Sequence, residues 1–325
     1  MLYIPFENYQ GQVGGPSTFM HYLYNFLMAN NIELATDVND ARIKTIFFPI
    51  AYDLGRLKQL KSRGCRIIQR LDGIYYPSKH GEKYTELNRD IKEIYCDLAD
   101  YVVFQSHYSQ SQCSEQFGKP ETSTIITNGV NTELFIANTQ VDFNKSKTIR
   151  FITTGNFRNI DMLEPIVLAL DQLVDDGMSV ELTIIGPVVA ALEVYLNRSY
   201  IMHVGKVPLS QINSYLQKAD IFLYSHLNPP CPNSVLEAIA VGLPVVGFDS
   251  GAMSELLFWQ KDLLAYVSDE VFQEYKSFKP QSLSQCIIKC IDSWFSYKKK
   301  ALQYTNHYSF TRCGEQYLQL LTAKF

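Results

Sequence analysis

Short apolar runs alternate with longer amphipathic segments along almost the whole chain. The apolar runs are rich in β-branched and aromatic residues, as in KTIFFPIA (44–51), YVVFQS (101–106) and VELTIIGP (180–187). The segments between them repeat their apolar positions with the period of a helix, as in DMLEPIVLALDQLVDDG (161–177). This alternation predicts stacked β-α units, in which parallel strands form sheets that helices cover on both faces.

The pattern breaks once, over residues 136–148 (IANTQVDFNKSKT), where polar residues replace the apolar period. We therefore expect one domain over residues 1–140 and a second from residue 141 onward. Each half has about five apolar runs, enough for a doubly wound α/β sheet of its own. In such sheets ligands bind at the carboxyl ends of the strands, so the loops that follow strands are where we expect the chemistry.

Composition narrows the class of protein. Hydrophobic residues make up 46% of the 325 residues and charged residues 19%, which is typical of globular domains with sizeable cores. The formal net charge of -4 offers no basic field for a phosphate backbone and argues against a dedicated nucleic-acid binder.

Cysteine spacing and hydropathy indicate a cytoplasmic protein. The seven cysteines are scattered and lack the CxxC pairs of a zinc site, so we interpret them as reduced core residues and expect no metal. No basic leader with an apolar core and no membrane-spanning run occurs. Membrane contact is at most peripheral, through Lys298–Lys300 beside Trp294 and Phe295, and a solvated helix end is the preferred interpretation of these lysines.

A glycine pair follows the first apolar run. In GQVGGPSTF (11–19), Gly14 and Gly15 permit a tight turn, and Pro16 suits the first turn of a helix. Such a helix start attracts a phosphate, but a plain turn between a strand and a helix has the same pattern. Both interpretations remain open from the residues alone.

A proline-rich turn near the C-terminal third is more specific. Pro229, Pro230 and Pro232 deliver the chain to the segment NSVLEAIAVG (233–242), which predicts one short helix with its N–H groups free for a diphosphate. Glu237 lies about one turn further in, where a carboxylate facing the cleft can accept hydrogen bonds from a vicinal diol such as a ribose. Its apolar neighbours argue against a solvated helix position.

These residues resemble a known motif. The run PCPNSVLEAIAVGLPVVGFDSGAMSEL (230–256) is similar to the donor-site motif of the retaining glycosyltransferases of GT-B fold, called glycosyl transferases group 1 or family four. Further stretches resemble the family in the same order along the chain. They are LADYVVFQS (98–106), IITNGVNTELF (125–135), FITTGNFR (151–158) and HVGKVPLSQINSYLQKADIFLYS (203–225).

The resemblance implies a fold and an activity. The fold is two facing Rossmann-like, doubly wound domains with a cleft between them. The first (1–140) would bind the acceptor and the second (141–306) a nucleotide-sugar donor, and a last helix (307–325) would return to the first. The activity is transfer of a sugar from a nucleotide-diphosphate sugar to a hydroxyl of a glycan, lipid-linked or small-molecule acceptor. It would proceed with retention at the anomeric carbon and without a metal or cofactor.

The resemblance also implies the donor residues. Glu237 matches the glutamate that holds the ribose. Pro229 stands where relatives carry the first acidic residue of the motif, so Asn228 or His226 is expected to reach the sugar hydroxyls. Arg158 is the cation expected to neutralise the leaving diphosphate. The remaining donor contacts are the GG loop of Gly14 and Gly15, the amides of Asn233, Ser234 and Val235, and Lys206 with Val207 against the base.

On the acceptor side, Asp72 stands before Gly73 where family members commonly carry a histidine. It is expected to orient an acceptor hydroxyl or to stabilise charge on the sugar, and capping the Gly73 turn is an equally weighted alternative. Arg70 falls on the same strand face and would then pair with it. Tyr75 is expected to receive a saccharide ring, and His107 is a further candidate for the acceptor.

Two departures from the family pattern leave an alternative function open. The acidic residue missing at Pro229 and the lysine missing near Arg158 are what a catalytically degenerate protein that only binds nucleotide sugars or glycans would show. An epimerase of the same architecture would need a cluster of acids and histidines that the sequence does not supply, and no GxGxxG supports a dehydrogenase.

Overall fold

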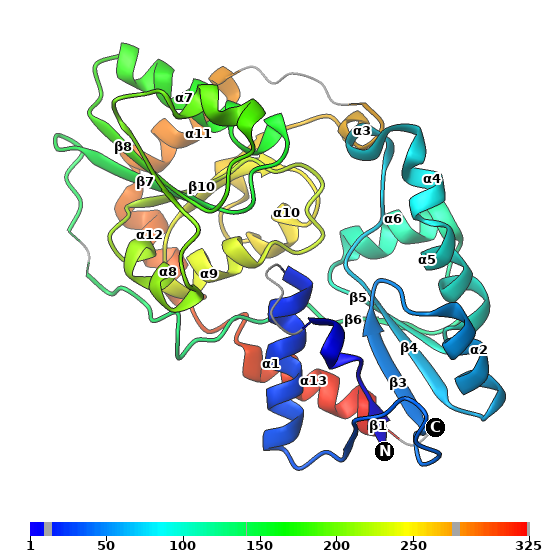
Figure 1. Cartoon of the computed structure of the whole chain (residues 1–325). Coiled ribbons are helices and arrows are strands. Elements are labelled where there is room, and N and C mark those ends of the chain that lie inside the picture. Colours follow the sequence, from blue (N-terminus) through cyan, green and yellow to red (C-terminus); the bar gives the residue numbers. More distant parts are fainter. Residues whose placement is uncertain (10–14, 141, 275–279, 324–325) are drawn as a thin grey trace. The chain divides into compact units, whose positions relative to one another are not determined.

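The computed structural model describes residues 1–9, 15–140, 142–274 and 280–323. The chain divides into two compact units (Figure 1). The first unit comprises Met1–Gly129, Phe272–Tyr275 and Phe310–Phe325, and the second comprises Val130–Val271 and Lys276–Ser309. Gly14, which the sequence analysis assigns to the donor site, lies outside the described residues.

The first unit is built on a parallel sheet of six strands. Their order is β2-β1-β3-β4-β5-β6, so the direction of winding reverses beside β1, as in doubly wound sheets. The strands are β1 (Leu2–Tyr3), β2 (Leu34–Ala35), β3 (Thr45–Pro49), β4 (Arg66–Leu71), β5 (Tyr101–Phe104) and β6 (Ser123–Ile125).

Helices cover both faces of this sheet. Phe47 of β3 faces one core, with α1 and α13, while Phe48 faces the other, with α2 and the π-helix η3. The helices are η1 (Phe6–Tyr9), α1 (Gly15–Ala29), α2 (Leu54–Ser62), α3 (Pro77–His80), η2 (Gly81–Lys83), α4 (Tyr84–Leu87), α5 (Arg89–Glu93), η3 (Ile94–Leu98), α6 (His107–Phe117) and α13 (Phe310–Thr322).

The second unit has its own six-stranded parallel sheet, with the order β12-β11-β10-β7-β8-β9. The winding reverses between β7 and β10, which makes these two strands the topological switch point. The strands are β7 (Ile149–Thr154), β8 (Val180–Ile185), β9 (Ile201–Gly205), β10 (Ile221–Tyr224), β11 (Val245–Asp249) and β12 (Leu264–Tyr266).

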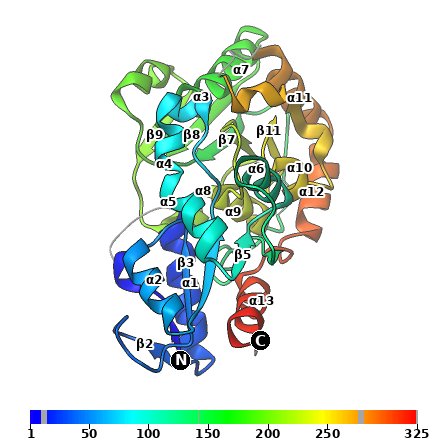
Figure 2. The same cartoon turned by 90° about the vertical axis from the view of Figure 1, so that its right-hand side faces the viewer.

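Two helical layers enclose the second sheet (Figures 1 and 2). Helices α7 and α11 pack together on one face, and α8, α9 and α12 lie on the other. The helices are η4 (Ile160–Met162), α7 (Glu164–Asp175), η5 (Ala190–Leu196), α8 (Leu209–Leu216), α9 (Asn233–Val241), α10 (Met253–Leu256), η6 (Lys261–Leu263), η7 (Asp269–Phe272), α11 (Pro280–Asp292) and α12 (Trp294–Gln303). The two parallel sheets with interleaved helices confirm the predicted α/β class.

The units separate in the sequence at Gly129, a few residues before the polar stretch that predicts a linker. Residues beyond Gly129 are held by the second unit, because Ile136 N–H donates to Asn213 Oδ1 (3.2 Å) and Asn138 N–H donates to Val241 O (3.0 Å). These polar residues therefore have fixed hydrogen-bond partners even though they carry no apolar period.

Three observations concern membrane spans, disulfides and metal sites. No described helix has both the length and the hydropathy needed to cross a membrane. All seven cysteines are free thiols. Within the described ranges, no three His, Cys, Asp or Glu side chains come together in a group able to hold a metal ion.

Candidate functional site

Three strand-end loops of the second unit pack tightly at the carboxyl edge of its sheet. Gly155 N–H donates to Ile185 O (3.0 Å), and Gly186 N–H donates to Gly205 O (2.8 Å). Gly186 has a φ of +118°, and a Cβ there would lie 1.8 Å from Gly155 O. Only glycine fits this position. The two hydrogen bonds join the loops after β7, β8 and β9 into one continuous surface.

His226 follows β10 at the switch point and lies beside the loop after β7. Its ring makes an edge contact with Phe157 (centroids 5.9 Å apart) and lies 4.6 Å from the Tyr224 ring. A Cβ on Gly155 would be 3.1 Å from His226 Cε1, so glycine leaves room for the imidazole. The histidine is thus held by aromatic packing at the edge where doubly wound sheets bind ligands.

The loop that leads into α9 is held by buried hydrogen bonds. Asn228 has a φ of +54°, its N–H donates to Ser250 Oγ (2.9 Å), and its side-chain amide donates to Val271 O (3.3 Å). The carbonyl of Pro229 accepts the Ala252 N–H (2.8 Å). The structure thus uses the Asn228 amide to hold the neighbouring segment, a role that the sequence analysis did not consider.

Helix α9 begins without a side-chain cap. Pro232 occupies the N-cap position and makes no capping hydrogen bond through its side chain. Asn233 and Ser234 are half-buried there, and the Val235 N–H donates to Pro232 O (3.1 Å). The arrangement leaves the positive end of the helix dipole beside the switch point.

Glu237 lies one turn into α9 and is only 9% exposed. Burial raises the pKa of its carboxyl to about 8. Its side chain makes no hydrogen bond or ion pair with any of the described residues. A buried carboxyl without partners is costly, so this position favours a ligand that brings hydrogen-bond donors to it.

The expected cations of the donor site lie on the same edge. Arg158 follows β7 and Lys206 follows β9; both side chains are exposed, and Val207 is half-buried. The Arg158 N–H donates to Met162 Sδ (3.3 Å), which fixes its backbone and leaves the guanidinium in solvent. Exposed side chains on the strand-end loops can move toward a bound anion.

Asp161 is a buried carboxylate that the sequence analysis missed. It is 7% exposed, and its Oδ2 accepts the Leu227 N–H (3.1 Å), so it ties the loop after β7 to the loop after β10. The only signal in the sequence was an acid between the apolar residues Ile160 and Met162.

The acceptor candidate Asp72 forms a buried ion pair with Arg70 in the first unit. The Arg70 side chain is fully buried, donates to Asn128 Oδ1 (2.7 Å) and stacks over the Phe19 ring at 3.7 Å. Burial raises the pKa of the Asp72 carboxyl, although the Arg70 charge opposes this rise. Of the predicted roles, pairing with Arg70 is the one seen directly.

The other acceptor candidates lie on loops or helix starts of the first unit. The Tyr75 backbone is held by Asn88, whose side chain accepts its N–H (3.0 Å) and donates to its carbonyl (2.8 Å). The Tyr75 ring meets His80 edge-on at 4.9 Å. His107 is the exposed first residue of α6. Gly15, a candidate for the donor rather than the acceptor, is the exposed first residue of α1.

The chain is similar to known proteins in sequence and in fold. Residues 148–276 match the family model for glycosyl transferases group 1. No curated protein sequence matches the chain. Among solved structures, sucrose-phosphate synthase from Thermosynechococcus elongatus is similar with a TM-score of 0.78 at 14% identity, over 98% of this chain and 97% of that one.

Two further structures agree in fold. HepE from Anabaena in complex with UDP and glucose has a TM-score of 0.71 at 14% identity, over 99% of this chain and 98% of that one. A glycosyltransferase from Rickettsia africae has a TM-score of 0.66 at 13% identity, over 95% and 83% of the two chains. Residues 148–276 thus match glycosyl transferases group 1, and the described chain has the GT-B fold, as the sequence resemblance predicted.

Proposed function

We propose that this glycosyltransferase transfers a sugar from a nucleotide-diphosphate sugar to a hydroxyl acceptor, with retention at the anomeric carbon and without a metal or cofactor. The observation that carries the proposal is Glu237, a buried carboxyl without described partners, one turn inside an uncapped helix at the topological switch point. The HepE structures, which contain UDP, UDP-glucose, or UDP and glucose, support a nucleotide-sugar donor.

The donor would bind along the carboxyl edge of the second sheet. The start of α9 offers N–H groups from Asn233 and Ser234 to the diphosphate, and the helix dipole favours its negative charge. Glu237 then receives the ribose hydroxyls, and their hydrogen bonds offset the cost of burying its carboxyl. Lys206 and Val207 would border the base at the end of β9.

Arg158 would stabilise the leaving nucleotide diphosphate. When the bond between sugar and diphosphate breaks, negative charge grows on the diphosphate, and a guanidinium can meet two of its oxygens at once. Asp161 acts differently, because its carboxylate is committed to the Leu227 N–H. It is a positioning residue that holds the His226–Asn228 turn against the loop after β7.

The acceptor hydroxyl would be bound by the first unit. Asp72 with its partner Arg70 presents one charged pair at the end of β4, and Tyr75 and His107 border the loops after β4 and β5. The substrate class is a glycan, a lipid-linked sugar or a small hydroxyl compound. A cytoplasmic location agrees with seven free thiols, because a reducing compartment keeps cysteines in that state.

A panel of nucleotide sugars tests the activity directly. With a broad acceptor mixture, at least one donor should release its nucleotide diphosphate, and Arg158→Ala should slow that release by about 10² fold. Arg158→Lys should recover part of the rate, since it restores the charge without the planar fork. A flat response to every donor would count against an active transferase.

A degenerate binding protein is the second candidate. Pro229 occupies the position of the first acidic residue and is held by Ala252, so no carboxylate contacts the transferred sugar from that place. Calorimetry separates the two functions. Nucleotide-sugar binding without transfer and without donor hydrolysis would favour the binding protein.

A further inference from the structure

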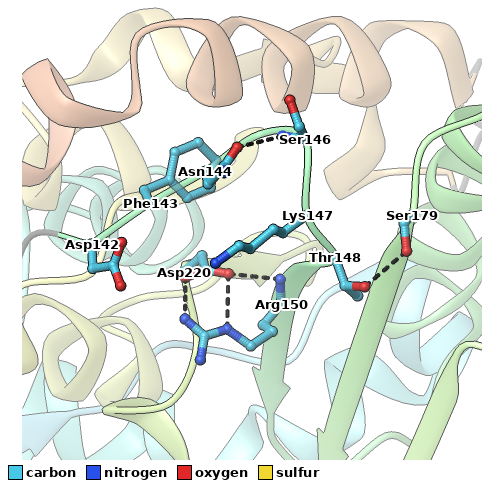
Figure 3. Close-up of a pocket in the computed structure, with 9 residues that line it drawn as sticks. All are labelled: Asp142, Phe143, Asn144, Ser146, Lys147, Thr148, Arg150, Ser179 and Asp220. Carbon is cyan, nitrogen blue, oxygen red and sulfur yellow. Dashed lines mark hydrogen bonds and ion pairs between the residues drawn. The ribbon is translucent and has the colours of Figure 1, made fainter.

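A hollow of about 620 Å³ lies at the amino edge of the second sheet (Figure 3). It is lined by residues at the starts of three adjacent strands, with Thr148 and Arg150 at β7, Ser179 before β8 and Asp220 before β10. The donor loops all follow the carboxyl ends of the same strands. The hollow is therefore separated from the donor site by the length of the sheet, and the proposed function does not use it.

One acid in the hollow is already neutralised. Asp220 accepts from Arg150 at Nε (3.1 Å), Nη2 (2.6 Å) and the backbone N–H (2.8 Å), and its side chain is 6% exposed. The Trp294 indole donates to the Asp220 carbonyl (2.9 Å). The floor of the hollow is thus a rigid hydrogen-bonded unit whose carboxylate is occupied.

Outside the Arg150–Asp220 pair, the charged residues of the lining are Lys147 and Asp142. Lys147 points its ammonium into the hollow (Figure 3) and forms no ion pair with any residue that the structure describes. Lys298 is not part of the lining; it is 2% exposed and interacts electrostatically with Asp220. Within the lining, Lys147 and Arg150 balance Asp142 and Asp220, so Lys147 is the cation that an anionic ligand would contact.

The rest of the lining suits a polyol. Ser146, Thr148 and Ser179 contribute hydroxyls, and the hydroxyls of Thr148 and Ser179 are 2.9 Å apart. The Phe143 ring borders the hollow and is held by stacking on Trp294, with centroids 4.7 Å apart and planes 14° apart. In a saccharide site, hydroxyls hydrogen-bond to the polar rim of the sugar, and an aromatic ring packs against its apolar face.

We propose that this hollow is a second binding site, distinct from the donor site, for a small anionic sugar such as a monosaccharide phosphate. Its volume falls in the range of small-molecule sites, roughly 300 to 1,000 Å³. The anionic group meets Lys147, and the sugar hydroxyls meet the serine and threonine hydroxyls beside Phe143. Because Phe143 stacks on Trp294, occupancy changes the surroundings of that indole.

Tryptophan fluorescence tests the proposal. The chain has two tryptophans, so a Trp259→Phe protein reports on Trp294 alone. Titration with glucose 6-phosphate should change this signal with saturation in the millimolar range or below. Glucose and inorganic phosphate, which each supply half of the proposed contacts, should bind at least about tenfold more weakly.

Matched variants complete the test in the same background. Lys147→Ala should weaken glucose 6-phosphate binding roughly three- to tenfold, a modest factor because the ammonium is solvent-exposed. Lys145→Ala is the control, since Lys145 lies on the same loop as Lys147 but pairs with Asp292 of α11 (3.2 Å). Glu237→Ala should leave this titration unchanged.

Three results would overturn the second site. They are no saturable response, equal affinity of the Lys147→Ala and parent proteins, and inorganic phosphate binding as tightly as the sugar phosphate. Loss of the response in Glu237→Ala would also overturn it, because the ligand would then be in the donor site. The proposed transferase function does not depend on any of these outcomes.

Discussion

Glu237 makes the stability of the ligand-free protein depend on pH. Its carboxyl has a pKa of about 8 when folded, against 4.5 ordinarily, because burial disfavours the charged form. Below pH 4.5 the carboxyl is protonated in both states and has no effect. As pH rises from 4.5 to 8 only the unfolded chain releases this proton, so the folded state loses stability.

Glu237→Gln removes this penalty while keeping the shape of the side chain. Chemical denaturation should show the variant equal to the parent near pH 4.5 and more stable, by as much as a few kcal/mol, at pH 8.5. Equal stability of the two proteins at pH 8.5 would show that the carboxyl is well solvated or has a partner.

Lys298 and Asp161 show why the surroundings of single side chains cannot all be predicted from the sequence. A run of three lysines favours a solvated helix end, yet Lys298 is buried because it lies one turn after Trp294 on the face of α12 that meets Asp220. Asp161 gained its role from the Leu227 N–H, 66 positions away. Local patterns cannot identify a partner so distant in sequence.

Helix α9 was predictable as an element because its signals are local. The prolines before it, Gly242 with a φ of +78° after it, and the buried strand β11 all follow each other within one short stretch. The hollow at the other edge of the sheet was not predictable. It arises only where the starts of β7, β8 and β10 come together.

Helix α13 completes the core of the first unit although it is the last element of the chain. Phe310, Cys313, Tyr317 and Leu321 are buried there, and a Cβ on Gly129 would lie 2.5 Å from the Phe310 Cα. Truncation after Ser309 should therefore unfold the first unit and leave the second folded. Limited proteolysis should show a resistant fragment starting near Val130; resistance of the whole truncated chain would contradict this role of α13.

At the scale of the whole molecule, each unit has its own sheet and its own core. Calorimetry should therefore resolve two unfolding transitions. A nucleotide diphosphate that binds only the second unit should raise one of them, by about 2.7 kcal/mol of stability at a ligand concentration of 100 Kd. Equal shifts of both transitions would show that the units unfold together or that both bind the nucleotide.

The most direct test of the account is the affinity of the protein for nucleotide diphosphates with and without Glu237. Calorimetric titration with UDP, GDP and ADP identifies the preferred base, and the same ligand is then titrated into Glu237→Ala. Hydrogen bonds to a charged group contribute roughly 1.5 to 3 kcal/mol, so affinity should fall about 10-fold to 150-fold, and less in Glu237→Gln. An alanine variant that folds and binds the nucleotide as tightly as the parent would contradict the placement of the donor site at α9.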